Sequence, residues 1–201
     1  MKRRLRVTAA LLLLSALTLP GYAADRARAE EIVQGKCFVC HGANGESSTP
    51  LFPRLSGQHA AYVARQLADY KSGRRKNPVM QSMVDDLSQA DFLALGAYFE
   101  SQAPVAHAVD DADLAAAGRT LYDHGKPGAG VAACAGCHGP TAAGTEQLPR
   151  LAGQHAQYTQ TQLRQFSQRR RTNDNAVMQT IARKLTEPEI KAVAAYLSGL
   201  K

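Results

Sequence analysis

Residues 34–45 read QGKCFVCHGANG, and residues 133–144 read ACAGCHGPTAAG. Each stretch holds two cysteines that are separated by two residues and followed at once by a histidine. Together the two units use all four cysteines of the chain. A helix places positions i, i+3 and i+4 on one face, so the thiols and the imidazole of each unit can address one planar group. The six residues concerned are Cys37, Cys40, His41, Cys134, Cys137 and His138.

The unit Cys-x-x-Cys-His predicts covalent attachment of haem c. Two thiols at this separation can add to the two vinyl groups of a haem, and the histidine can ligate the iron through a neutral ring nitrogen. Structural disulfides would suit an exported chain, but they leave the repeated histidine without a role. A thioredoxin-like redox pair needs a βαβ context, which the sequence lacks. A zinc site shared by both units would leave each half without a group to fill its core. We therefore expect two covalently bound haem c groups, with His41 and His138 as iron ligands.

The sequence around these units also occurs twice. Residues 52–67 read FPRLSGQHAAYVARQL and residues 148–163 read LPRLAGQHAQYTQTQL, with ten of sixteen positions identical. Each half continues with a methionine segment and a last helix that a capping box, Ser-x-x-Asp or Thr-x-x-Glu, would open. Helical spacing without alternating strand patterns predicts an all-α tandem duplication. We expect a first domain over 24–101, a linker over 102–112 and a second domain over 113–201.

The N-terminal segment predicts export. Basic side chains precede an apolar run at 7–19, and small residues follow Pro20, which is the order of a secretory signal peptide. An uncleaved anchor helix is the alternative, but the run is shorter than the about 20 residues that span a bilayer. We expect a signal peptide over 1–23 and a mature protein in the periplasm. Only 20 of the 24 basic side chains then remain, against 17 acidic ones, so the composition does not favour a nucleic-acid partner.

The haem units, the signal peptide, the repeated Pro-Arg-Leu-x-Gly-Gln-His segment and a methionine before a capped last helix resemble the dihaem cytochromes c4. The resemblance covers nearly all of 25–201. It implies an all-α pair of class I cytochrome c domains related by approximate two-fold symmetry, with the haem propionate edges facing across the interface. It also implies an electron carrier, not an enzyme, with an upstream cytochrome donor and a membrane haem–copper oxidase as acceptor. Peripheral association with the membrane stays open.

An enzymatic class is the alternative. The chain could be the dihaem subunit of a sulfur-oxidising flavocytochrome, or a small dihaem enzyme acting on peroxide or thiosulfate. Catalysis by the haem would need an open iron position. One methionine candidate for each haem argues instead for closed sites, and therefore for electron transfer.

The repeat identifies the methionine ligands. Met80 and Met83 both lie in the first half, whereas Met178 is the one methionine of the second half. Met80 and Met178 each lie eight residues before the first residue of the last capping box. The residue that matches Met83 is Ile181, which cannot bind iron. We therefore expect Met80 and Met178 as the second iron ligands and Met83 as a filler of the core.

Two further pairs of residues repeat. Pro53 and Pro149 follow the haem histidines by twelve and eleven residues, and the resemblance implies that their carbonyls bind the other ring nitrogen of the histidine; a plain turn is the alternative. His59 and His155 could give bis-histidine haems. Because each half has a methionine, we expect these histidines to form hydrogen bonds at a helix start.

Other polar residues give weaker indications. The basic clusters at 74–76 and 169–171 precede the methionine segments, and they could pair with haem propionates, form a docking rim or lie in solvated loops. His107 and His124 have no counterpart in the other half, so we do not expect them to bind iron.

The two halves also differ. Class I domains tend to carry Gly-x-x-x-aromatic where the first helix crosses the last, and the second half has Gly118 and Tyr122 there. The first half has Ala29 and Val33 at these positions. The sequence therefore predicts this helix crossing less strongly in the first half than in the second. More basic charge and the longer approach to Cys134 predict a higher reduction potential for the second haem.

Overall fold

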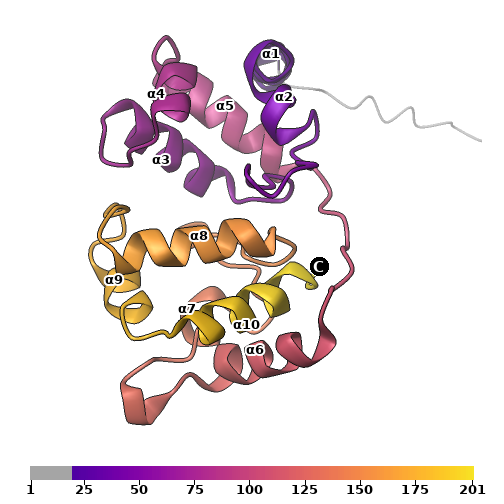
Figure 1. The fold of residues 1–201 in the computed structure, drawn as a ribbon. Coiled ribbons are helices and arrows are strands. Elements are labelled where there is room, and N and C mark those ends of the chain that lie inside the picture. The colour runs from indigo at the N-terminus through magenta and orange to yellow at the C-terminus, as the bar shows by residue number, and fades with distance from the viewer. Residues whose placement is uncertain (1–19) are drawn as a thin grey trace, which may run out of the picture.

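A computed structural model describes the backbone of residues 20–201 and the side chains of residues 25–201. Two helical units lie one against the other, joined by an extended connection along one edge (Figure 1). In this part of the chain, the only β pairing is a single bridge between Lys126 and Val131, so the all-α prediction is confirmed. None of its helices combines the length and apolar content that crossing a bilayer requires. The predicted signal peptide over 1–23 falls outside the described side chains.

The first unit holds five α-helices and one π-helical turn. They are α1 (Pro20–Ile32), the π turn η1 (Val33–Cys37), α2 (Phe38–His41), α3 (Ala60–Lys71), α4 (Pro78–Val84) and α5 (Gln89–Glu100). Helix α5 packs against both α1 and α3. Ala29 and Val33 are fully buried, so small and β-branched side chains form this crossing where the second half uses glycine and an aromatic ring.

The second unit repeats this order. Its elements are α6 (Ala112–His124), the 3-10 turn η2 (Pro127–Ala129), α7 (Ala135–His138), α8 (Ala156–Ser167), α9 (Val177–Ala182) and α10 (Glu187–Ser198). Helix α6 crosses α10 at Gly118, where an added Cβ would lie 1.9 Å from the carbonyl oxygen of Ala192. Tyr122 is fully buried and donates its hydroxyl to the Gly139 carbonyl at 2.6 Å. The expected glycine–aromatic crossing is therefore present in this half.

Both predicted capping boxes form. The Ser88 side chain accepts from the backbone N–H of Asp91, and the Asp91 carboxylate accepts from the N–H of Ser88. Thr186 and Glu189 repeat this exchange at α10. Hydrogen bonds from Ser88, and then from Arg28, lower the pKa of Asp91 to about 2. These reciprocal bonds satisfy donors that a helix start would otherwise leave unpaired.

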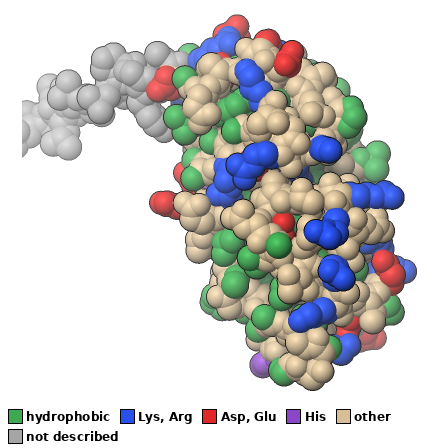
Figure 2. Space-filling model, turned by 90° about the vertical axis from the view of Figure 1, so that its left-hand side faces the viewer, with side chains coloured by type: hydrophobic (Ala, Val, Ile, Leu, Met, Phe, Trp, Pro, Cys, Tyr) green, Lys and Arg blue, Asp and Glu red, His purple; other side chains and the backbone are tan. Residues whose placement is uncertain are grey.

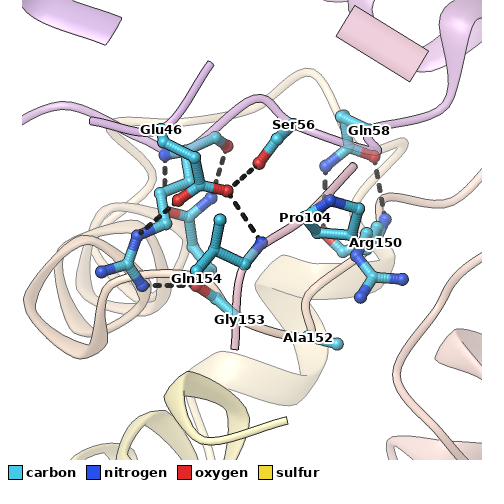
Figure 3. A pocket seen from close by; sticks show the side chains of 10 residues that line it. Glu46, Ser56, Gln58, Pro104, Arg150, Ala152, Gly153 and Gln154 are labelled. Carbon is cyan, nitrogen blue, oxygen red and sulfur yellow. Dashed lines mark hydrogen bonds and ion pairs between the residues drawn. The ribbon is translucent and has the colours of Figure 1, made fainter. Parts of the chain in front are cut away.

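The two units meet through a reciprocal set of hydrogen bonds (Figure 3). Gln58 donates its side-chain amide to the Arg150 carbonyl and accepts from the Arg150 N–H, both at 2.9 Å. Gln154 makes the same two bonds with Arg54, also at 2.9 Å. Because these four bonds form two matching pairs, one from each domain, the pairing has the approximate two-fold symmetry that was expected.

Candidate functional site

The first Cys-x-x-Cys-His unit lies where the π turn η1 becomes helix α2. Cys37 is the last residue of that turn, and Cys40 and His41 lie on the short helix. Cys37 and Cys40 are half-buried, whereas His41 is only 6% exposed. A π turn inside a helix is rare and often marks a functional site. The wider turn therefore ends at the first residue of the predicted attachment unit.

The second unit lies at the start of helix α7. Cys134 caps this helix, Cys137 is exposed, and His138 is only 6% exposed. All four cysteines of the chain are free thiols in the structure, so no disulfide uses them. Burial raises the pKa of Cys37 to about 11 and also raises the pKa of Cys134. The first cysteine of each unit thus lies in a water-poor environment inside its domain.

Each haem-unit histidine is fixed by a proline carbonyl. His41 Nδ1 lies 2.9 Å from the carbonyl oxygen of Pro53, and His138 Nδ1 lies 3.3 Å from that of Pro149. A carbonyl can only accept, so Nδ1 carries the proton and Nε2 keeps its lone pair. Burial lowers the pKa of both imidazoles, while the carbonyl bond acts in the opposite direction. A neutral, oriented imidazole is the form that binds iron, and the expected role of the two prolines is confirmed.

The methionines lie on the short helices α4 and α9. Met80 packs against the core of the first domain, and Met178 packs with Ile181 against the core of the second. Asn77 caps α4 and accepts from the Met80 N–H at 3.0 Å, which holds the start of this helix. Met83 also lies on α4 and is half-buried. Met83 is not among the side chains that pack against the first core, so the filler role expected for it is wrong, and Met80 packs there instead.

The side chains available in each domain fit a haem c. Two free thiols and a neutral imidazole share one short helical segment, and a thioether comes from a separate helix. Arg54 and Arg150 follow the two prolines directly, and each holds a buried Nε–H that makes no hydrogen bond. The Nε of Arg54 forms an ion pair with Glu46 at 3.5 Å, whereas that of Arg150 has no such partner among the described residues. Burial lowers the pKa of both guanidinium groups. A buried donor needs an acceptor, and the carboxylates of a haem are acceptors of matching charge.

His59 and His155 bind backbone carbonyls of the opposite domain. His59 Nε2 donates to Ala143 O at 2.8 Å, and His155 Nε2 donates to Ser47 O at 2.9 Å. Both residues stand at the starts of helices, α3 and α8, so the expected hydrogen-bonding role is confirmed. That the partner lies across the domain interface was not predicted. The repetition of Gly-Gln-His in both halves was the available signal, because a symmetric interface uses matching residues from each half.

The two basic clusters are divided between the interface and the surface. Arg75 and Arg171, one from each cluster, are buried between the domains. Arg75 donates to the Tyr158 hydroxyl at 2.9 Å, and Arg171 donates to the Tyr62 hydroxyl at 3.0 Å. The remaining members of the clusters are exposed: Arg74, Lys76, Arg169 and Arg170. None of the three expected roles included burial between the domains. A run of cations in the sequence does not show which of them faces the other domain.

The unmatched histidines, His107 and His124, lie outside the Cys-x-x-Cys-His segments. His107, in the connection between α5 and α6, places Nε2 3.2 Å from a carboxylate oxygen of Glu46. His124 is the exposed last residue of α6. That neither of them binds iron stays a prediction.

The chain is similar to known proteins over most of its length. The family model for cytochrome c matches it twice, at residues 27–103 and 115–201. It is 41% identical to cytochrome c4 of Azotobacter vinelandii, over 94% of this chain and 96% of that protein. It is 38% identical to a thiosulfate dehydrogenase electron acceptor of Stutzerimonas stutzeri, over 82% of this chain and 78% of that protein.

A solved structure shows the same arrangement of the two domains. The crystal structure of reduced recombinant cytochrome c4 from Pseudomonas stutzeri superposes with a TM-score of 0.83 at 38% sequence identity, covering 88% of this chain and 98% of that one. The two attachment units, the matching domain pair and these similarities agree with one another. The chain therefore belongs to the cytochrome c family and, within it, to the dihaem cytochromes c4, electron-transfer proteins with two covalently bound haem c groups.

Proposed function

We propose that this protein is a periplasmic carrier that moves electrons between respiratory-chain donors and a terminal oxidase, after removal of a signal peptide over 1–23. One haem is attached by Cys37 and Cys40 and ligated by His41 and Met80. The other is attached by Cys134 and Cys137 and ligated by His138 and Met178. The observation that supports this best is the pair of matching sites, each with a carbonyl-fixed histidine and a methionine that would serve as the second iron ligand.

Two protein ligands for each iron would leave no coordination position for a substrate. When bound, each haem supplies an iron that alternates between the ferric and ferrous states. The chain's own residues fix the geometry around it: Pro53 and Pro149 orient the imidazoles, and the domain cores exclude water. A thioether is a soft, neutral ligand that favours the ferrous state and raises the potential. These features suit electron transfer without bond making, in which the protein controls ligand position and environment.

A basic groove supports docking of an acidic partner. Figure 2 shows Lys and Arg side chains along the face that carries α4 and α9, from one domain to the other. Between the domains lies a groove of about 500 Å³, lined by Lys76, Gln165, Arg169, Arg170 and Thr172. The side chains of its three cations make no ion pair or hydrogen bond with any other described residue. Unpaired cations in a hollow attract a partner surface that carries carboxylates.

The backbone at Arg169 indicates that its side chain matters. Arg169 has a φ of 59°, in the left-handed region, where the first domain has Gly73 with a φ of 75°. An arginine in this conformation costs on the order of 1 kcal/mol that a glycine would avoid. A cation at a strained position fits a surface role in the groove.

The attachment is tested by the mass of the purified mature protein. We expect a chain that begins after Ala23, carries two haems and has no free thiol. Loss of haem in acidic acetone, or bound zinc in its place, would show that the attachment sites are wrong.

The carrier role is tested with membranes that contain a haem–copper oxidase. The reduced protein is added, and its reoxidation is followed by haem absorbance with and without cyanide. We expect cyanide-sensitive reoxidation over many turnovers, which slows as salt screens the docking charges. Reoxidation that cyanide does not affect would contradict transfer to such an oxidase. The same mixture, sedimented, shows whether the protein associates peripherally with the membrane.

A second partner is favoured by one relative, the thiosulfate dehydrogenase electron acceptor. The same fold could accept electrons from a sulfur-oxidising enzyme. Addition of thiosulfate and a purified thiosulfate dehydrogenase should then reduce both haems within the turnover time of that enzyme. Reduction no faster than by thiosulfate alone would exclude this partner.

A further inference from the structure

One charged position distinguishes the two haem-binding loops. The carbonyls of Gly45 and Ala142 accept the same backbone bond, from the leucine of the Pro-Arg-Leu segment, at 2.7 and 2.8 Å. These two residues are therefore equivalent, and so are the residues that follow them, Glu46 and Ala143. The first domain has a carboxylate at this position, whereas the second domain has a methyl group.

Glu46 is partly buried, with 24% of its side chain exposed. One carboxylate oxygen lies 3.5 Å from Arg54 Nε and 3.2 Å from His107 Nε2. The other accepts from the Val105 N–H at 3.2 Å and from the Ser56 hydroxyl. Figure 3 shows the carboxylate of Glu46 with its bond to the Ser56 hydroxyl. The charge of Glu46 is thus held in place by the first domain and by the connection.

Arg150, the counterpart of Arg54, has no such neighbour. Its Nε is buried without a partner, and Figure 3 marks no bond to its guanidinium. Among the described residues, no carboxylate pairs with it. Arg54 meets Glu46 and also donates to the Gly153 carbonyl at 2.6 Å. The charge of Arg54 is therefore offset by a partly buried carboxylate. In the second loop the one carboxylate, Glu146, is exposed and makes no ion pair with Arg150.

These arginines are placed to affect the irons. Arg54 follows Pro53, whose carbonyl binds His41, and Arg150 follows Pro149, whose carbonyl binds His138. A nearby positive charge favours the ferrous state because it opposes the additional charge of the ferric iron, and a carboxylate cancels that effect. The matched loops thus present different electrostatic environments to otherwise similar ligands.

We propose that Glu46 lowers the reduction potential of the first haem, relative to the second, by neutralising Arg54. Glu46 acts through the arginine and not as an iron ligand. The inference rests on the proposed attachment of that haem at Cys37, Cys40 and His41.

The test compares the potentials of both haems in four holoproteins: the unaltered chain, Glu46→Gln, Ala143→Glu and the double variant Glu46→Gln/Ala143→Glu. Glutamine keeps the size and most hydrogen bonds of Glu46 but removes its charge. We expect Glu46→Gln to raise the lower potential by about 59 mV, the value for a tenfold change in a one-electron equilibrium. Ala143→Glu should lower the other potential, and the double variant should exchange the order of the two.

Separate titration components identify which haem responds. Unchanged potentials in Glu46→Gln, or an equal shift of both components, would overturn the proposal. A shift in Glu46→Ala without one in Glu46→Gln would also overturn it, since packing and not charge would then be responsible. The mass of each preparation distinguishes this failure from failure of the attachment: a protein with two thioether-bound haems but no response refutes only the role of Glu46, whereas a missing first haem refutes both.

Discussion

His41 and His138 illustrate how little of each haem site depends on long-range structure. A backbone carbonyl eleven or twelve residues away orients each imidazole, and the two thiols precede the imidazole on the same short segment. Residue types at fixed spacing were therefore sufficient to predict this part of the site. The identity of the methionine needed the internal repeat, because two candidates lie within one turn of the same helix.

The methionine assignment makes a prediction about single side chains. Met80→Ala and Met178→Ala should each remove half of the weak red absorption band of methionine-bound ferric haem. Each should also lower one potential by roughly 100 mV, within the about 0.8 V that axial ligands span, because a soft neutral ligand to ferrous iron is lost. Visible spectra and redox titration provide the measurements.

Met83→Leu is the matched control, since Met83 lies on the same helix as Met80. It should leave the band and both potentials unchanged. If Met83→Leu removes the band and Met80→Leu does not, the ligand of the first haem has been assigned to the wrong methionine.

Other residues of the site could not be predicted individually. Arg75 and Arg171 lie among exposed cations in the sequence, yet they are buried against tyrosines of the opposite domain. Glu46 follows a haem unit without any motif of its own. Their roles depend on which surfaces two domains bring together, and no local pattern encodes that pairing.

At the scale of helices, the capping boxes contribute to the free energy of unfolding by an amount that can be measured. Ser88→Ala removes a cap that is worth about 1 kcal/mol of folding stability. Chemical unfolding of the holoprotein should show a loss of this size. Ala90→Ser, at an exposed position of the same helix, should have a much smaller effect.

The Asp91 carboxyl gives the same cap a pH dependence. Its pKa is lowered from 3.8 to about 2 by Ser88 and Arg28. A lowered folded pKa contributes stability that is present above pH 4 and is lost as the pH falls through the interval from about 4 to about 2. The Ser88→Ala variant should therefore lose less stability over this interval than the unaltered protein. An equal acid sensitivity of the two proteins would mean that the Ser88 bond does not set this pKa.

The helix crossings make a second prediction at this scale. A Cβ at Gly118 would lie 1.9 Å from the Ala192 carbonyl oxygen, whereas one at Gly128 would meet nothing within 4 Å. Gly118→Ala should therefore destabilise the second domain by about 1–3 kcal/mol, as overpacking does, while Gly128→Ala should change the unfolding temperature little. Calorimetry of the two variants tests this, and equal unfolding temperatures would show that α6 and α10 separate without cost.

Helix positions themselves were largely predictable, because caps and apolar spacing are local. The π turn over Val33–Cys37 was not, since a π turn depends on how the first helix must rotate to reach both its core and the attachment unit. The sequence predicted the crossing of α1 and α5 less strongly than that of α6 and α10. The crossing of α1 and α5 forms because Ala29 is small enough for close approach, and Val33 fills the space that the ring of Tyr122 takes in the other half.

Across the whole molecule, the duplication allows each domain to complete the other. Matching glutamines, histidines and arginines reach over the interface in both directions. Reciprocity of this kind follows when one unit is copied and then pairs with its copy about a two-fold axis. We propose domain boundaries at 24–101 and 113–201, with a linker over 102–112. With these boundaries, all the contacts named here join one domain to the other and none involves the linker.

The basic groove makes the prediction that belongs to this scale, because both domains line it. Lys76→Glu, Arg169→Glu and Arg170→Glu combined should slow oxidation of the reduced protein by the anion hexacyanoferrate(III) by roughly tenfold or more at low salt, within the range of electrostatic steering. The rate with the unaltered protein should fall as salt is added, and the rate with the variant should not.

A control with the same change in net charge separates local from global effects. Arg119→Glu, Lys191→Glu and Lys201→Glu reverse three charges that lie on α6, on α10 and at the chain end. If anions approach through the groove, this control should retain most of the rate and its salt dependence, and a cationic oxidant should react faster with the groove variant than with the control. Equal slowing in both triple variants would mean that net charge alone guides the encounter, and the groove would then have no special part in docking.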